Sequence, residues 1–103
     1  MYRYVNREQI IYGHFRDYYA NAEKMLAYVK SKGWVAWSVY SPLTGAGNDV
    51  VWHADYPSLA AVEEEMNAAM NDAGFMDLVR SQSPHIVQGS QVSELLVTLT
   101  GVA

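Results

Sequence analysis

The order of hydrophobic patterns along the chain is the feature that most restricts its fold. Two stretches, residues 14–32 and a second one opening at Pro57 and Ser58, carry apolar residues at three- and four-residue steps, as amphipathic helices do. Around them lie runs rich in Val, Ile, Tyr and Trp, which favour strands. These runs are residues 2–11, 34–40, 49–56 and 92–100. The expected order is therefore β-α-β-β-α-β.

That order is typical of the ferredoxin-like split βαβ arrangement, an α+β fold. We expect a four-stranded antiparallel sheet in the order 4-1-3-2, with both helices on one face. The 103 residues are enough for a single domain, 1–103, with one modest core. We expect Gly33 to follow the first helix and Ser58 to cap the second. Residues 71–74 are expected to interrupt the second helix, and Ser83 and Pro84 to end it.

Apolar residues occupy both faces of the expected strands. In residues 34–40, Val35, Trp37 and Val39 alternate with Trp34, Ala36, Ser38 and Tyr40. Two helices on one side cover only one face, and a monomer rarely exposes a second apolar surface of this size. We therefore expect a homodimer that packs sheet on sheet, with a second copy of the chain as the partner.

Charge and composition exclude several function classes. The net charge of −4 disfavours nucleic acid as a partner. The charge is uneven, since residues 1–33 are net basic and residues 34–103 net acidic; this indicates either two differently charged helix surfaces or a basic surface that meets an acidic one on a second subunit. Cysteine is absent, which excludes disulfides, thiolate zinc sites and a cysteine nucleophile. Without an apolar membrane span or a signal peptide, we expect a cytoplasmic protein.

Short motifs spread over nearly the whole chain point to a known group of proteins. They are Gly33-Trp34, the turn segment 41–48 (SPLTGAGN), the helix opening 55–60 (DYPSLA) and 93–96 (SELL) in the last strand. On these motifs the chain resembles the dimeric α/β barrel superfamily and, within it, NIPSNAP-like small proteins. The resemblance implies a ferredoxin-like subunit, an obligate dimer whose two sheets form a barrel, and often a ligand cleft between sheet and helices.

The same resemblance leaves the activity open. Relatives include quinol-type monooxygenases, haem-degrading oxygenases, polyketide cyclases and muconolactone isomerases, so the fold does not define the function. The haem-degrading pattern of Asn, Trp and a helix-borne His is not clearly present. Asn6 could match its first member, but His85 follows a proline and is expected outside the helix. We expect no cofactor.

The three histidines are the candidate catalytic groups, because histidine is the side chain that titrates near neutral pH. His53 shares a strand face with Asp55, and such a pair could orient the imidazole as a base. His14 is expected near the mouth of the cleft and His85 near its open end. The alternatives are an interfacial His53, a surface His14 and a loop His85. Their spacing matches no local metal-ligand motif, so no metal is expected.

Aromatic residues make 13% of the chain. Tyr18, Trp37 and Trp52, with His14, are predicted to line a pocket for a small aromatic or polyketide-like ligand. Ordinary core and dimer packing is the alternative. Three functions follow: a small-molecule cleft protein, a cofactor-independent monooxygenase, isomerase or cyclase using that cleft, and a non-catalytic structural or interaction dimer. A filled space between sheet and helices would favour the third.

Overall fold

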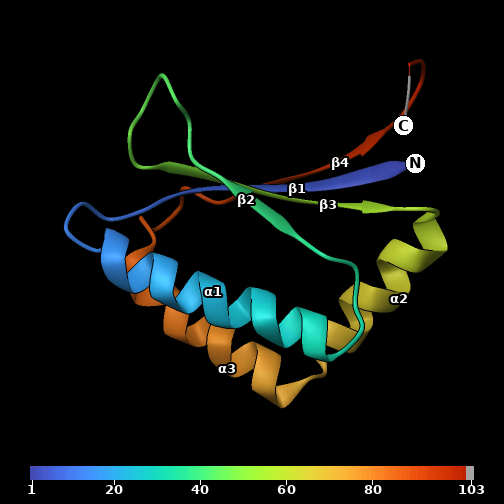
Figure 1. Cartoon of the computed structure of the whole chain (residues 1–103), viewed down its shortest axis with the longest axis horizontal. Helices are drawn as coiled ribbons and strands as arrows, with labels where there is room; N and C mark the ends of the chain where they lie inside the picture. Colours follow the sequence, from blue (N-terminus) through green and yellow to red (C-terminus); the bar gives the residue numbers. More distant parts are fainter. Residues whose placement is uncertain (102–103) are drawn as a thin grey trace.

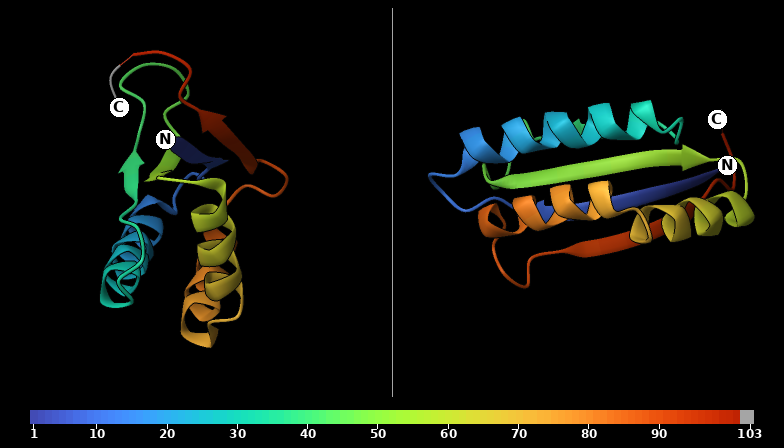
Figure 2. Two further views of the ribbon diagram at one scale, coloured as in Figure 1. Left: turned by 90° about the vertical axis from the view of Figure 1, so that its right-hand side faces the viewer. Right: turned by 90° about the horizontal axis from the view of Figure 1, so that it is seen from below.

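The computed structural model describes residues 1–101 and has two layers, a four-stranded antiparallel sheet and three helices (Figure 1). Along the chain the elements are β1 (Tyr2–Gln9), α1 (Phe15–Ser31), β2 (Ser38–Tyr40), β3 (Asp49–Tyr56), α2 (Leu59–Met70), α3 (Ala73–Gln82), a short 3-10 turn (Ser83–His85) and β4 (Val92–Val97). Figure 2 shows all three helices on one face of the sheet. The predicted ferredoxin-like α+β fold is confirmed.

The sheet has the predicted strand order, β2-β3-β1-β4. The two long central strands pair from Tyr2 opposite Tyr56 to Gln9 opposite Asp49. This register places Tyr4, Asn6 and Glu8 of β1 on the same face as Ala54, Trp52 and Val50 of β3, because side chains alternate along a strand. That face carries the buried residues of β3 and points toward the helices.

Apolar spacing explains the helices. In α1 the buried residues Tyr18, Ala22 and Val29 recur at four and seven residues, so they lie on one stripe. The N-cap of α2 is Ser58, whose hydroxyl accepts a hydrogen bond from Ala61 N–H, as expected. The predicted interruption after α2 is also confirmed. Asp72 caps a separate helix, α3, by accepting a hydrogen bond from Phe75 N–H.

Three strands are shorter than predicted. Strand β1 ends at Gln9 rather than at residue 11. The last strand ends at Val97 rather than at residue 100, and in the segment 34–40 only Ser38–Tyr40 is strand. Residues 34–37 lead from α1 back to the sheet, and the backbone N–H of Val35 donates to Glu65 Oε1 at 2.7 Å instead of to a neighbouring strand. A side chain on α2 therefore takes the hydrogen bond that the sheet would have used.

The core lies between the two layers in two groups of buried residues. Near the start of α1 the first group is Ile10, Tyr18, Ala22, Val50 and Trp52. Near the start of α2 the second group is Ala54, Tyr56 and Val62. His85 lies just beyond α3, in the 3-10 turn, as its position after Pro84 indicated. None of the helices in residues 1–101 is both long and apolar enough to span a membrane.

The outer face of the sheet is more mixed than the sequence indicated. Tyr40, Val92 and Leu96 are about half exposed there, in agreement with the predicted apolar surface. Two ion pairs also cross neighbouring strands on this face, Arg3 with Asp55 at 2.8 Å and Arg7 with Glu94 at 3.2 Å. The residues of β4 are exposed on both faces.

Candidate ligand cavity

A cavity of about 850 Å³ lies between the sheet and the helices. Its walls come from β1, β3, all three helices, the 34–37 segment and the loop that precedes β4. Proteins bind small molecules in concave, mostly apolar pockets of this size. The expected cleft between sheet and helices is therefore present as a shape, and the space is not filled as a purely structural dimer would require.

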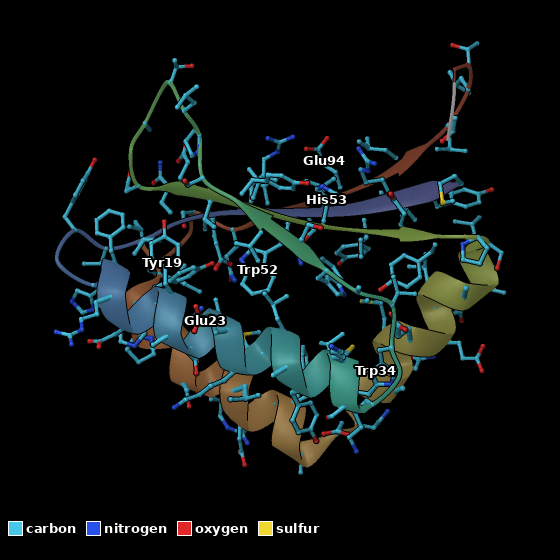
Figure 3. All side chains as sticks on the ribbon, in the orientation of Figure 1. Tyr19, Glu23, Trp34, Trp52, His53 and Glu94 are labelled. Carbon is cyan, nitrogen blue, oxygen red and sulfur yellow. The ribbon has the colours of Figure 1, made fainter. Side chains whose placement is uncertain are left out.

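All three tryptophans of the chain line the cavity. Trp52 points from the sheet toward the helices, whereas Trp34 lies near α2 and α3 (Figure 3). Trp37 packs edge-on against Tyr4 with ring centroids 5.6 Å apart, and Trp34 packs edge-on against Phe75 at 5.7 Å. These contacts fix large flat surfaces around the cavity, to which Met25, Met66 and Met70 add adaptable apolar surface.

A chain of hydrogen bonds fixes the first polar group of the wall, the carboxylate of Glu8. Trp52 Nε1–H donates to the Tyr18 hydroxyl at 2.7 Å, and that hydroxyl donates to Glu8 Oε2 at 2.6 Å. Gln91 Nε2 donates to the other oxygen, Oε1, at 3.1 Å. Burial, and then the neighbouring Glu8 carboxylate, raise the pKa of Tyr18, so its hydroxyl keeps its proton and stays a donor.

Glu65 supplies the second carboxylate of the cavity wall, and hydrogen bonds hold this side chain in place as well. It accepts from Val35 N–H at Oε1 and from the Tyr56 hydroxyl at Oε2, the latter at 2.5 Å. Burial and Glu65 raise the pKa of Tyr56, which therefore also remains a donor. Because Val35 lies between Trp34 and Trp37, this carboxylate holds the segment that carries two of the three indoles.

Gln82 is a buried polar residue of the wall, only 4% exposed. Its Nε2 donates to the Tyr18 backbone carbonyl at 3.1 Å. Within residues 1–101, its Oε1 is the one buried side-chain oxygen or nitrogen with no hydrogen-bond partner. The amide therefore ties α3 to α1 at the cost of one unsatisfied acceptor.

The predicted ligand-binding residues separate into two groups. Trp37 and Trp52 line the cavity, whereas Tyr18 and His14 do not. Tyr18 is fully buried behind the wall and contacts the cavity residues Glu8, Trp52 and Gln82 through hydrogen bonds. His14 lies before α1, where its Nδ1 is 3.0 Å from Nδ1 of His85.

The His14–His85 contact joins two candidates that are far apart in the sequence. One ring must donate and the other accept, so the pair shares one Nδ1 proton. The backbone reinforces this junction, because Ile11 N–H donates to the His85 carbonyl at 2.9 Å. Neither ring lines the cavity.

His53 and Asp55 lie on the outer face of the sheet, opposite the cavity. Figure 3 shows His53 on the far side of the sheet from the helices, with Glu94. The His53 ring stacks on Tyr40 at 4.9 Å between centroids. Asp55 binds Arg3 through both oxygens, at 2.8 and 3.0 Å, and this contact lowers the pKa of Asp55. The structure thus brings neither residue to the cavity, and a catalytic role for them stays a prediction.

The cavity also has lining residues that were not predicted from the sequence, among them Glu8, Glu65, Gln82 and Trp34. Strand alternation held a signal for Glu8, since it follows Tyr4 and Asn6 at two-residue steps. Within residues 1–101, no three His, Asp or Glu side chains come together as metal ligands would.

The backbone of this chain superimposes on solved structures over nearly its whole length. An uncharacterized NIPSNAP domain protein from Burkholderia xenovorans matches with a TM-score of 0.84 at 13% identity, covering 100% of this chain and 99% of the other. The chain has the same fold as this NIPSNAP domain protein. No protein-family model matches the sequence, and no curated protein matches it.

Solved structures of enzymes also match the fold of this chain. An antibiotic biosynthesis monooxygenase matches with a TM-score of 0.76 at 12% identity, covering 97% of this chain and 100% of the other. SnoaB, a cofactor-independent oxygenase from Streptomyces nogalater, matches with a TM-score of 0.73 at 13% identity, covering 98% and 95%. Identities this low show a common fold and transfer no reaction or residue role.

Proposed function

We propose that this protein binds a small aromatic or polyketide-like molecule in the sheet–helix cavity. The observation that carries the proposal is that all three tryptophans of the chain line one cavity of about 850 Å³. Apolar pockets with aromatic walls and a few fixed polar groups bind flat, mostly apolar ligands. Here the indoles and methionines supply the apolar contact, and Glu8 orients the ligand.

A homodimer is part of this proposal. The residues of β4 are exposed on both faces, although the strand is rich in leucine and valine. Val92 and Leu96, with Tyr40 of β2, leave apolar surface on the outer face of the sheet. A second copy laid across that face would bury this surface and use the same residues twice, as a two-fold interface does.

Catalysis is the second candidate, and the fixed carboxylate of Glu8 is the observation that favours it. No histidine in the described part of the chain lines the cavity, so an acid–base reaction there would use Glu8 or Glu65. Both carboxylates accept hydrogen bonds at each oxygen, but those to Glu65 hold the 34–37 segment, whereas the Gln91 side chain that donates to Glu8 Oε1 is exposed. Glu8 is therefore the candidate base, and a Glu8→Gln variant that binds ligand but loses turnover would support an enzyme.

The experiment is a binding screen of one- to three-ring aromatic compounds, followed by tryptophan fluorescence. Because all three tryptophan side chains line the cavity, ligand binding should change the tryptophan fluorescence emission. The Ala69→Leu variant adds side-chain volume to the cavity wall and should weaken binding at least about tenfold. Ala68→Leu is the matched control, because Ala68 is exposed on the same helix. Equal binding by the two variants would contradict the proposed site.

A further inference from the structure

The charged side chains described in the cavity wall are all acidic. Among residues 1–101, two carboxylates line the cavity, Glu8 and Glu65, and no Lys, Arg or His does. Each carboxylate accepts hydrogen bonds at both oxygens, as an acceptor-only group does. The cavity therefore presents negative charge at its wall without a counter-charge from the protein there.

The basic side chains of the chain lie elsewhere. Arg3 and Arg7 pair with acids on the outer face of the sheet. Lys32 pairs with Asp72 and Arg80 with Asp77. The remaining three are exposed on α1: Arg16, Lys24 and Lys30. An anionic ligand would thus meet two carboxylates and no cation, which is unfavourable in a partly enclosed site.

The two carboxylates stand apart. Glu8 lies opposite Val50 in the sheet, whereas Glu65 contacts Tyr56 at the other end of β3. Tyr56 is six residue steps along the strand from Val50, roughly 20 Å at about 3.3 Å per step. One metal ion cannot be bound by both carboxylates. The arrangement suits an extended organic ligand that reaches Glu8 with one end.

We infer that the ligand is an organic cation, a protonated amine or quaternary ammonium group carried on an aromatic body. This inference rests on the proposed function and specifies its ligand. The cationic end lies at Glu8, whose oxygens each keep capacity for a further contact and whose partner Gln91 is exposed and free to move aside. The tryptophan faces add cation–π attraction and contact the aromatic body.

The test compares three naphthalene probes that carry a cationic, a neutral and an anionic group: 2-(aminomethyl)naphthalene, 2-(hydroxymethyl)naphthalene and 2-naphthoate. Dissociation constants are measured by calorimetry on the full chain. We expect the amine to bind at least about tenfold more tightly than the alcohol, and the carboxylate to bind most weakly.

Glu8→Gln keeps an acceptor for Tyr18 and removes the charge. It should weaken amine binding about tenfold and change alcohol binding less than about twofold. Glu63→Gln is the control, because Glu63 is exposed on α2 and does not line the cavity. If the alcohol or the carboxylate binds as tightly as the amine, the cation inference is overturned and the aromatic-binding function stands. If none of the three binds, both proposals are contradicted.

Discussion

The hydroxyl of Tyr18, on α1, donates a 2.6 Å hydrogen bond to the Glu8 carboxylate of β1, which lines the cavity. Tyr18 is fully buried and also accepts from Trp52 Nε1–H at 2.7 Å. One buried hydroxyl therefore connects the helix layer, the sheet and the cavity wall. Its removal should affect both stability and the position of the only wall carboxylate on the sheet.

Tyr18→Phe leaves the Trp52 N–H and one Glu8 oxygen without their partner. We expect the free energy of unfolding to fall by about 1–3 kcal/mol, the usual cost of an unsatisfied buried group. Urea denaturation measures this change. Tyr19→Phe is the matched control, because Tyr19 is the exposed neighbour on the same helix; equal effects in the two variants would show that the buried hydrogen bonds do not matter.

Gly74, on α3, has no room for a side chain. A β-carbon at this position would overlap the hydroxyl of Tyr28 and lie 2.9 Å from its Cζ. Tyr28 cannot easily move, because its hydroxyl donates to Asp72. Gly74→Ala should therefore destabilise the fold by about 1–3 kcal/mol despite alanine's better helix propensity.

The cause can be isolated in a double-mutant cycle. In a Tyr28→Ala background the overlap is absent, so Gly74→Ala should be neutral or stabilising. Thermal denaturation of the four proteins gives the coupling. Destabilisation of the same size in both backgrounds would place the cause in the helix backbone rather than in the contact with Tyr28.

Asp72 makes the free energy of unfolding depend on pH in the acid range. Hydrogen bonds from the Tyr28 hydroxyl and from Phe75 N–H, together with Lys32, lower the pKa of Asp72 from 3.8 to about 2. A lowered folded-state pKa stabilises the protein above the unfolded-state value, and this contribution is lost as pH falls from 3.8 toward about 2. The difference in urea midpoint between the native protein and Asp72→Ala should therefore be constant above about pH 5 and shrink toward about pH 2.

Asp77→Ala provides the comparison for that pH series. Asp77 is exposed and its carboxylate pairs only with Arg80, one turn away on the same helix. Exposed pairs of this kind contribute little to stability. The urea midpoint of the Asp77→Ala variant should therefore match that of the native protein at every pH. If the difference in urea midpoint between the native protein and Asp72→Ala stays constant down to about pH 2, the assigned role of the Asp72 carboxylate is contradicted.

The proposed dimer predicts a mass near twice 11.6 kDa by light scattering at micromolar concentration. Leu96→Lys places a charge on the outer face of β4 and should shift the protein toward the monomer. Leu59→Lys is the control, because Leu59 is similarly exposed on α2, in the helix layer. A native protein of monomeric mass would refute the dimer.

The sequence was sufficient to predict the fold because the fold depends on repeated features. Three- and four-residue spacing in α1, the glycine after it and Ser58 before α2 each indicate local structure independently. The shortened β2 could not be foreseen. It depends on one long-range contact, between Val35 N–H and Glu65, which no local pattern encodes.

The site was harder to predict, because it depends on which face of each strand meets the helices. Trp52 and His53 are neighbours in sequence and lie on opposite sides of the sheet. The buried set Val50, Trp52, Ala54 and Tyr56 is more apolar than the alternating set with His53 and Asp55, so the sequence did hold a signal for the orientation of β3. The presence of the cavity depends on the spacing between the sheet and the helix layer, for which the sequence shows no pattern.

The most direct test of the cavity as the functional site is an NMR titration of the ¹⁵N-labelled protein with the tightest aromatic ligand from the screen. The indole N–H signals of Trp34, Trp37 and Trp52 should all shift, because all three side chains line the cavity. The signals of Tyr40 and His53, on the outer face of the sheet, should stay in place. Shifts at Tyr40 and His53 with unchanged indole signals would contradict the account.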